Sequence, residues 1–191
     1  MSNAESQSRP VPVWATESVQ LTAWNPRWEQ RAADFTAEVQ RLLRGWLVGE
    51  IDHVGSTAVP GLIAKPVIDL QAPSTHPEAA LDQSRTALEA ADWFVVPREL
   101  DRRPWRWFVV RTDRERRRRL AHVHLMLPGE PRMQQQMRFR DRLRVDHDLA
   151  GRYATVEQEL ARRHPTDREA YTRAKTAFVD TVVGQPSDDS V

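Results

Sequence analysis

Apolar residues recur with two different periods along this chain. Between residues 26 and 44 they return every three or four positions, as at Trp28, Ala32, Phe35 and Val39, which is the spacing of an amphipathic helix. The same period predicts helices over residues 75–91, 131–147, 148–164 and 166–183. Apolar runs predict strands over residues 47–54, 67–72, 93–96, 105–111 and 120–127, with a weaker edge strand over 19–24. This order is typical of a mixed α/β domain, with helices packed on a mixed sheet.

Two of the predicted helices open with the pattern of a capping box. In this pattern a Thr side chain accepts a hydrogen bond from the backbone three residues on, and a Glu at that later position reaches back. Thr75 with Glu78, and Thr166 with Glu169, fit the pattern. We therefore expect Thr75 and Thr166 to be the N-caps of these helices.

The composition is that of a globular protein. The chain has 191 residues, of which 40% are hydrophobic and 29% charged, enough for one domain with a sizeable core. We expect that domain to span residues 19–185 between flexible tails, and Met1–Ala4 resembles the remnant of an expression tag. The sequence has no apolar run of membrane-spanning length and no signal pattern, which predicts a cytoplasmic protein. Zero cysteines exclude disulfides and cysteine-based zinc sites.

The charge pattern does not favour nucleic acid as a partner. The formal net charge is only +1, so no global field attracts a polyanion. The densest basic run, Arg116 to Arg119, lies between two predicted strands and contains no aromatic residue for base stacking. We interpret this run as a solvated hairpin tip, with an RNA or polyphosphate contact as the alternative. We expect neither nucleic acid nor a membrane to be a partner.

A turn of small residues joins the first two predicted strands. Gly55 has no Cβ, so its backbone N–H can approach an oxyanion closely, and the Ser56 hydroxyl and neighbouring Thr57 can add further donors. Asp69, on the second strand, could hold a hard cation such as Mg²⁺ against a bound phosphate. The pattern therefore indicates a phosphate or nucleotide site. The alternative is a tight connection in which Ser56 merely caps a short helix.

Two histidines on a later strand supply a second candidate site. His122 and His124 alternate, so both project from one face of the predicted strand. If that strand neighbours the strand of Asp69, two imidazoles and a carboxylate would form a metal site suited to Zn²⁺, Mn²⁺ or Fe²⁺. Alternatively, one histidine is an inward, hydrogen-bonded residue and the other lies at the surface. His53, beside the small-residue turn, could be a third imidazole or could orient that turn.

Three basic residues could contribute to the same site. Lys65 comes just before the strand of Asp69 and could neutralise a phosphate as a point charge. Arg140 and Lys175 each lie on a basic face of a predicted C-terminal helix, and both could point into a cleft opposite the turn. Ordinary solvent exposure of Lys65, and salt bridges between helices for the other two, are the alternatives.

One block of this sequence resembles the signature of the GrpB family. That signature is an acidic residue, His, a hydrophobic residue, GSTAVPGL, a short gap, and KP followed by an apolar pair and Asp. The chain supplies Asp52, His53, Val54, Gly55 to Leu62, Lys65-Pro66 and Val67-Ile68-Asp69. Further matching pieces are Asn25 to Trp28, His122 to His124, Phe139 to Arg144 and Arg168 to Lys175. The resemblance extends from about Val19 to about Val183.

The resemblance implies a nucleotidyltransferase-like fold. Such enzymes use two or three carboxylates to hold two metal ions, and the first acid of the usual pair is replaced here by Val67. We therefore expect a nucleotide or phosphorylated small molecule to bind at Gly55-Ser56, with metal-assisted nucleotidyl or phosphoryl transfer as the enzymatic interpretation. Two alternatives stay open. One is a non-catalytic anion-binding module, and the other is a metal-dependent hydrolase that uses Asp69, His122 and His124.

Overall fold

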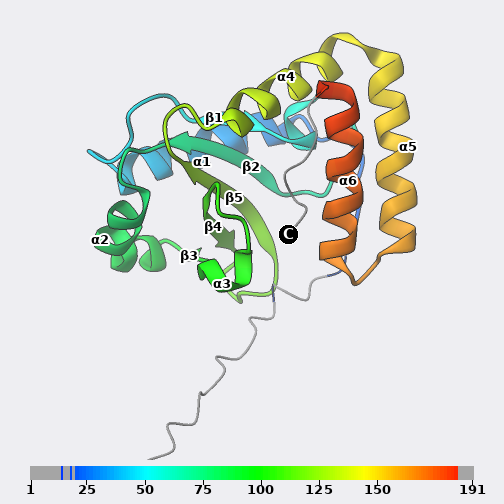
Figure 1. Ribbon diagram of the computed structural model, residues 1–191. Coiled ribbons are helices and arrows are strands. Elements are labelled where there is room, and N and C mark those ends of the chain that lie inside the picture. The colour runs from blue at the N-terminus through cyan, green and yellow to red at the C-terminus, as the bar shows by residue number, and fades with distance from the viewer. Residues whose placement is uncertain (1–13, 15–17, 19, 185–191) are drawn as a thin grey trace, which may run out of the picture.

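The computed structural model describes Trp14, Ser18 and residues 20–184, and it contains one five-stranded sheet with helices packed around it (Figure 1). The strands are β1 (Asp52–Val54), β2 (Ile68–Pro73), β3 (Trp93–Val95), β4 (Trp107–Thr112) and β5 (Arg119–Met126). The α-helices are α1 (Arg27–Leu42), α2 (Pro77–Ala90), α3 (Arg98–Asp101), α4 (Pro131–Val145), α5 (His147–Arg163) and α6 (Arg168–Val183). Most of the predicted flexible tails, including Met1–Ala4, lies outside the described residues.

The sheet is mixed, as predicted. Its strand order is β1-β2-β5-β4-β3, and β2 pairs with β5 in parallel while the other pairs are antiparallel. In the parallel pair Asp69 lies opposite His122 and Gln71 lies opposite His124. Two strands far apart in sequence therefore bring their polar residues into neighbouring positions at the centre of the sheet.

Alternation along β2 and β5 separates the core from the polar face. Ile68 and Leu70 of β2 and Val123 of β5 are buried in the main hydrophobic core, together with side chains of α1 and α2. Asp69 and His122 alternate with them, so they project from the opposite face of the sheet. The core thus fixes which face carries the charged residues, because slipping either strand by one residue would bury them in the core.

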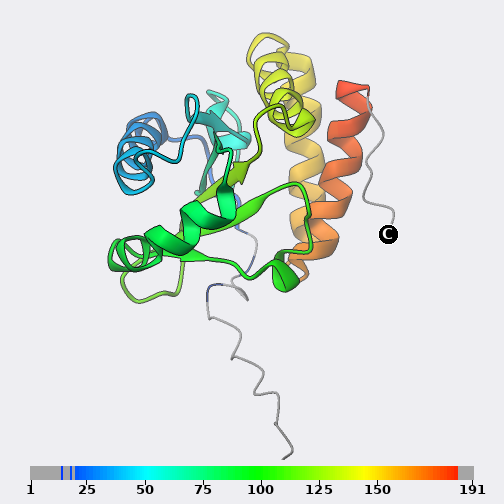
Figure 2. The same cartoon turned by 60° about the vertical axis from the view of Figure 1, so that its left-hand side comes forward.

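The helices form two groups on either side of the sheet. In Figure 1 the helices α4, α5 and α6 stand together beyond the sheet, and in the turned view of Figure 2 they remain on the side opposite α1 and α2. A smaller hydrophobic cluster joins this second group to the loop after β1, and includes Val59, Leu62, Phe139 and Tyr153. The polar face of the sheet therefore looks toward the C-terminal helices.

Several predicted details of the elements are wrong. The strand expected over residues 47–54 is regular only at Asp52–Val54, and the expected edge strand over 19–24 is reduced to a bridge between Thr22 and Ala64. Two short helices were not predicted: α3, and a 3₁₀ helix, η2 (Ser56–Ala58), directly after the glycine of the turn. Short helices of this kind carry no apolar periodicity, because 3 or 4 residues are too few for an apolar position to recur.

Neither predicted capping box forms. Helix α2 begins at Pro77, its N-cap is His76, and no side chain caps it. Helix α6 has Asp167 as its N-cap, whose carboxylate accepts from the backbone N–H of Ala170. Both helices thus begin one residue later than predicted, because the N-caps are His76 and Asp167 in place of Thr75 and Thr166.

The helices of this fold are too short or too polar to cross a bilayer. Among the described residues, none has a stretch that is both long and apolar enough to form a transmembrane span.

Candidate functional site

Asp69, His122 and His124 meet on the polar face of the sheet. Nδ1 of His122 lies 2.8 Å from Oδ1 of Asp69, and Nε2 of His124 lies 3.7 Å from the same oxygen. One ligand-type atom from each of the three residues lies within 4.8 Å of the others. The predicted convergence of the two strands therefore occurs, and it follows directly from the parallel register of β2 and β5.

The proton states of this cluster follow from its burial. Burial alone would raise the pKa of Asp69, but hydrogen bonds from His122 and then His124 hold that pKa well below its usual value. Burial lowers the pKa of His122 to about 4, against the opposing attraction of Asp69. Burial, followed by the charge of Arg106, also lowers the pKa of His124. At neutral pH the cluster is one carboxylate with two neutral imidazoles, as metal ligation requires.

The cluster fits a divalent metal ion by its chemistry and its spacing. Two imidazole nitrogens and a carboxylate oxygen are the usual ligands of catalytic Zn²⁺ sites. Ligand atoms about 2.1 Å from such an ion are separated from one another by roughly 3 to 3.5 Å. The distances of 2.8 and 3.7 Å from Asp69 bracket that range. Small side-chain shifts would bring the three ligand-type atoms to the separations that a bound ion requires.

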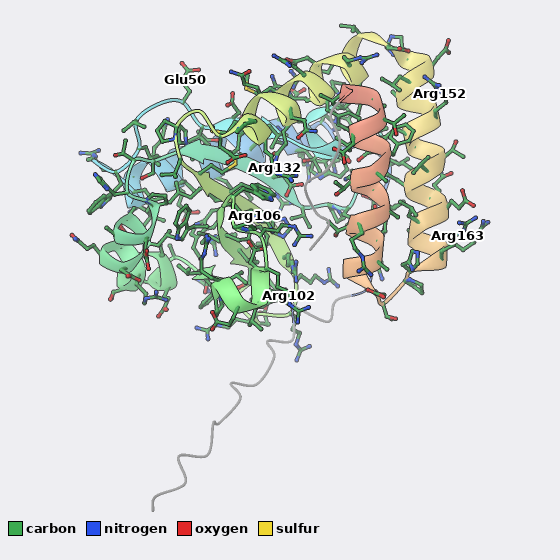
Figure 3. All side chains as sticks on the ribbon, in the orientation of Figure 1. Glu50, Arg102, Arg106, Arg132, Arg152 and Arg163 are labelled. Carbon is green, nitrogen blue, oxygen red and sulfur yellow. The ribbon has the colours of Figure 1, made fainter. Side chains whose placement is uncertain are left out.

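Aromatic and charged residues surround His124. Its ring is parallel to that of Trp105 with the centroids 6.1 Å apart, and Phe108 packs against both histidines. Arg106 places Nη1 2.7 Å from Nδ1 of His124 and forms a buried ion pair with Asp101. Figure 3 labels Arg106 where it overlaps the strands of the sheet in this view. The first site residues that sequence reasoning missed are thus Arg106 and its partner Asp101.

The small-residue turn lies directly against the cluster. Gly55 has a φ of +74°, and a Cβ at this position would come within 2.8 Å of Oδ2 of Asp69. The glycine is therefore required twice, for its left-handed backbone conformation and for the close approach of the carboxylate. For the same reasons, a larger residue at position 55 would strain the fold as well as the site.

Ser56 enters a buried polar network instead of capping the short helix. The N-cap of η2 is Gly55, and no side chain caps it. The Ser56 hydroxyl lies 3.2 Å from the Tyr153 hydroxyl and accepts from Nζ of Lys175 at 3.2 Å. Lys175 also forms an ion pair of 2.7 Å with Oε1 of Glu157, to which the hydroxyls of Tyr153 and Tyr171 donate. The network connects the turn to α5 and α6.

The charges of this network are fixed by one another. Burial would lower the pKa of Lys175, but the charge of Glu157 and the two tyrosines hold that pKa well above its usual value. Burial raises the pKa of both Tyr153 and Tyr171 far enough that they stay protonated donors. Lys175 is thus a cation at neutral pH and does not act as a base toward Ser56.

His53 orients the turn from its other side. Its Nε2 lies 2.9 Å from the Thr57 hydroxyl, and that hydroxyl donates to the carbonyl of Val67 at 3.3 Å. Thr57 must therefore accept from His53, whose hydrogen is on Nε2. Of the two interpretations of His53, the geometry favours the orienting role. His53 orients the turn through a hydrogen bond to the Thr57 side chain.

This arrangement predicts a loss of stability in mild acid. Burial lowers the pKa of His53 from 6.5 to about 4. The unfolded state therefore binds the proton first as the pH falls, so the stability that the neutral ring contributes is present above pH 6.5 and is lost toward pH 4. Between pH 7 and pH 5 we expect His53 to account for about 2 kcal/mol of lost unfolding free energy. Urea titrations of wild type and His53→Gln at both pH values measure this difference, and equal losses would contradict the assignment.

Lys65 borders the cleft, but Arg140 does not. Nζ of Lys65 lies 3.6 Å from the centroid of the Tyr171 ring, at the edge of the cleft. Arg140 forms an ion pair with Asp141 and donates to the carbonyl of His53 at 3.0 Å. Arg144, one turn later, donates to the carbonyl of Ala58 at 2.9 Å. Arg140 and Arg144 thus clamp the backbone of the turn from outside and do not line the cleft.

The arginine run is only partly a solvated hairpin tip. Arg117 and Arg118 are exposed, and their backbone N–H groups donate to the carboxylate of Asp113. Arg119 is partly buried, lies over the ring of Trp14 at 4.8 Å and donates to its carbonyl. Arg116 and Arg119 also border the cleft. The interpretation of the whole run as an exposed tip is therefore wrong for Arg119.

One cleft contains both the metal-type cluster and the buried network. Its volume is about 1230 Å³, and it lies between the polar face of the sheet and helices α4 to α6. Its lining includes Gly55, Ser56, Asp69, His122 and His124. The Lys and Arg side chains at its wall are Lys65, Arg103, Arg106, Arg116, Arg119, Arg132 and Lys175. Acidic side chains alternate with them, so the cleft has mixed charge and any anion site within it must be local.

Sequence reasoning missed the acid at the centre of the network. Glu157 is 1% exposed and belongs to α5, a helix for which no site residue was predicted. A signal was nevertheless present, because Leu149, Tyr153, Glu157 and Leu160 follow one another at helical spacing. A single carboxylate within an apolar helical stripe is costly unless it is paired. That pattern identifies Glu157 as a residue in need of a partner.

Comparisons with known proteins place this chain among bacterial relatives. It is 36% identical over 171 residues to UPF0157 protein PA4798 of Pseudomonas aeruginosa, which covers 88% of this chain and 68% of the relative. It is 30% identical over 186 residues to a protein of Mycolicibacterium paratuberculosis named dephospho-CoA kinase, and spans 44% of that protein's length. It also spans only 47% of UPF0157 protein YqkA of Bacillus subtilis.

The fold and a family model agree with these relatives. The crystal structure of conserved protein GrpB from Enterococcus faecalis superposes with a TM-score of 0.70 at 21% identity, covering 85% of this chain and 99% of that one. The family model described as GrpB protein matches residues 18–185. With the Gly55 turn, the strand of Asp69 and the paired histidines all inside the matched region, this chain belongs to the GrpB family.

Proposed function

We propose that the cleft binds a phosphorylated small molecule, a nucleotide in the first instance, together with a divalent metal ion at Asp69, His122 and His124. One observation carries this proposal. A Cβ added at Gly55 would come within 2.8 Å of Oδ2 of Asp69, and both residues line the cleft, so the small-residue turn and the candidate metal ligands adjoin the same space. A phosphate group placed there would contact the turn and the metal ion together.

The residues around this position suit an anionic ligand. Lys175 is held as a cation beside Ser56, and Arg132 and Arg106 approach the Trp105 ring next to His124. Guanidinium groups match the geometry of phosphate oxygens. A bound divalent ion would add polarisation of a phosphoryl oxygen. The chain's own residues would orient the ligand and exclude part of the water from it.

The nucleotidyltransferase-like fold that the family resemblance implies would favour nucleotide binding over standard nucleotidyl transfer in this chain. The position of the usual first acid is occupied by Val67, which is buried at the wall of the cleft. Glu157 and Asp101 are buried acids at this wall, and they are paired with Lys175 and Arg106 respectively. A centre with one carboxylate and two imidazoles holds a single ion more naturally than two. These metal ligands therefore favour, as the second candidate function, metal-dependent hydrolysis of a phosphate ester or anhydride.

One relative suggests a specific compound for testing. The Mycolicibacterium paratuberculosis protein named dephospho-CoA kinase contains a region similar to this chain, although that region is less than half of its length. The name dephospho-CoA kinase refers to the whole relative, so it assigns no activity to the region that is similar to this chain. Dephospho-CoA is still a reasonable member of a panel, because it carries both a nucleotide and a pyrophosphate.

Thermal shift with paired additions tests the proposal. The panel is ATP, ADP, AMP, pyrophosphate and dephospho-CoA, each with and without Zn²⁺ or Mn²⁺, with adenosine as the phosphate-free control. A ligand at about 100 times its dissociation constant stabilises the folded state by about 2.7 kcal/mol. For a chain of this size that corresponds to a rise in Tm of roughly 5 to 10 °C. The rise should be larger when metal and phosphate compound are both present.

The same panel separates the candidate functions. Liberation of phosphate or of a nucleoside monophosphate with metal present would support hydrolysis, and transfer to an added acceptor would support a transferase. Stabilisation with no turnover of any compound would support the non-catalytic module. No change in Tm with any phosphate compound at millimolar concentration, with or without metal, would reject the proposal.

A further inference from the structure

A chain of polar contacts leads from the loop before β4 to His124. The Asp101 carboxylate accepts from Nε of Arg106 at 3.0 Å and from Nη2 at 2.5 Å. The third nitrogen of the same guanidinium, Nη1, lies 2.7 Å from Nδ1 of His124. All three side chains are largely buried, with the Arg106 side chain only 8% exposed. Arg106 is therefore held in place from one side and contacts a candidate metal ligand on the other.

The contact between Arg106 and His124 fixes where the imidazole hydrogen lies. Arginine offers only N–H donors, so Nδ1 of His124 must accept and cannot carry a hydrogen. In the neutral ring the hydrogen is then on Nε2, the atom that faces Asp69 at 3.7 Å. That nitrogen has no lone pair available for a metal ion while Arg106 stays where it is.

His122 is not restrained in the same way. Its Nδ1 faces the ionised Asp69 at 2.8 Å and donates to it, which leaves Nε2 with the lone pair. That Nε2 is buried and has no hydrogen-bond partner among the described residues. Moving the hydrogen of His122 to Nε2 breaks its hydrogen bond with Asp69 but brings it against no donor among the described residues, whereas moving the hydrogen of His124 to Nδ1 would point it at the N–H of Arg106.

The position that Arg106 occupies normally belongs to an acceptor. A histidine that ligates a metal ion usually donates its other N–H to a carboxylate, a backbone carbonyl or water, which leaves the ligating nitrogen unprotonated. Here Nδ1 of His124 faces a donor, Nη1 of Arg106. The Asp101 carboxylate, which could have accepted a hydrogen bond, contacts Arg106 and does not reach His124. The outer partner of His124 therefore favours the state without metal.

We propose that Arg106 is a positioning residue that limits metal affinity at Asp69, His122 and His124 by holding His124 in the tautomer that cannot coordinate. This inference rests on the metal site of the proposed function. His124 can coordinate a metal ion only when the hydrogen bond from Nη1 of Arg106 to Nδ1 of His124 breaks. Replacing Arg106 by a residue that can accept a hydrogen bond removes that competition, because the amide oxygen of glutamine can take the hydrogen of Nδ1.

The tautomers can be measured without any metal. Nitrogen-15 NMR of the imidazole rings in metal-free protein distinguishes a protonated from an unprotonated ring nitrogen. We expect His124 to carry its hydrogen on Nε2 and His122 to carry its hydrogen on Nδ1. Protonation of Nδ1 in His124 would overturn the inference, whatever the protein binds.

Metal titration of matched variants tests the consequence. Arg106→Gln leaves Asp101 buried without its partner, so Arg106→Gln is also made together with Asp101→Asn, and circular dichroism checks that both variants fold. We expect the double variant to bind Zn²⁺ or Co²⁺ about tenfold more tightly than wild type, the scale on which outer partners of ligating histidines act. Arg116→Gln, which removes a positive charge from the wall of the same cleft, is the control and should leave the affinity unchanged.

The outcomes separate the inference from the function on which it rests. If wild type binds the metal and the folded double variant binds it no more tightly, the inference is wrong and the metal site stands. If neither protein binds the metal, both the inference and the metal site are wrong. A gain of similar size in Arg116→Gln would show a general charge effect in the cleft and would also overturn the role of Arg106.

Discussion

Glu157→Ala should lower the free energy of unfolding by about 3 to 5 kcal/mol, which is the usual cost of removing one partner from a buried ion pair. Oε1 of Glu157 is 2.7 Å from Nζ of Lys175 and also accepts from the hydroxyls of Tyr153 and Tyr171. Without it, Lys175 keeps its charge in a polar network that has lost its only described carboxylate. Urea denaturation followed by circular dichroism measures the loss.

Two further variants show whether the loss comes from the buried charge. Glu157→Gln combined with Lys175→Met removes both charges, and we expect it to lose less than half as much stability as Glu157→Ala. Glu159→Ala, on the same helix, removes an exposed ion pair with Arg163 and should cost less than about 1 kcal/mol. If Glu157→Ala and Glu159→Ala are equally mild, the network does not stabilise the fold.

Asp69→Asn should weaken Zn²⁺ or Mn²⁺ binding by roughly 100-fold or more. This loss exceeds the one expected when only a hydrogen-bond partner of a metal ligand is removed, because Asp69 would itself be a ligand. Asparagine keeps the size of the side chain and an oxygen that can accept from His122, but it lacks the charge that a divalent ion requires. Because that hydrogen bond remains, we expect the unfolding free energy to fall by only about 1 to 2 kcal/mol. Calorimetric titration and urea denaturation of the same protein give both quantities.

The matched control for this variant is Asp180→Asn. Asp180 also borders the cleft, where one oxygen accepts from Gln135, but it lies outside the cluster of candidate ligands. Asp180→Asn should bind metal as wild type does. Equal weakening in the two variants would indicate a general effect of charge in the cleft, and unchanged binding in Asp69→Asn would remove the metal site from this face of the sheet.

Local patterns in the sequence were sufficient to predict the long helices, the main strands and three residues of the site. Alternation put His122 and His124 on one strand face, and a lone acid in an apolar strand drew attention to Asp69. The sequence alone could not give the parallel register of β2 and β5, which supplies the 2.8 Å contact between Asp69 and His122. That register depends on core packing between elements more than fifty residues apart. The expectation that these strands are neighbours came from the resemblance to the GrpB family.

The rest of the site depends on tertiary contacts that leave weak local signals. Arg106 and Asp101 lie in a loop and a one-turn helix, where no periodicity marks a buried ion pair. Arg140 and Lys175 have similar helical settings in the sequence, yet one clamps a carbonyl outside the turn and the other enters the buried network. Only the packing of α4 and α6 against the sheet distinguishes them.

The attachment of the turn to α5 and α6 has a consequence for recombination among relatives. A chimera that joined the first half of this chain to the last helices of a distant relative would retain the whole block from Gly55 to Asp69. It would nevertheless take from that relative the residues at positions 153, 157 and 175, where Tyr153, Glu157 and Lys175 are the partners of Ser56 in this chain. Such a chimera would therefore keep the buried network only if the relative supplies matching side chains about a hundred residues away from the turn.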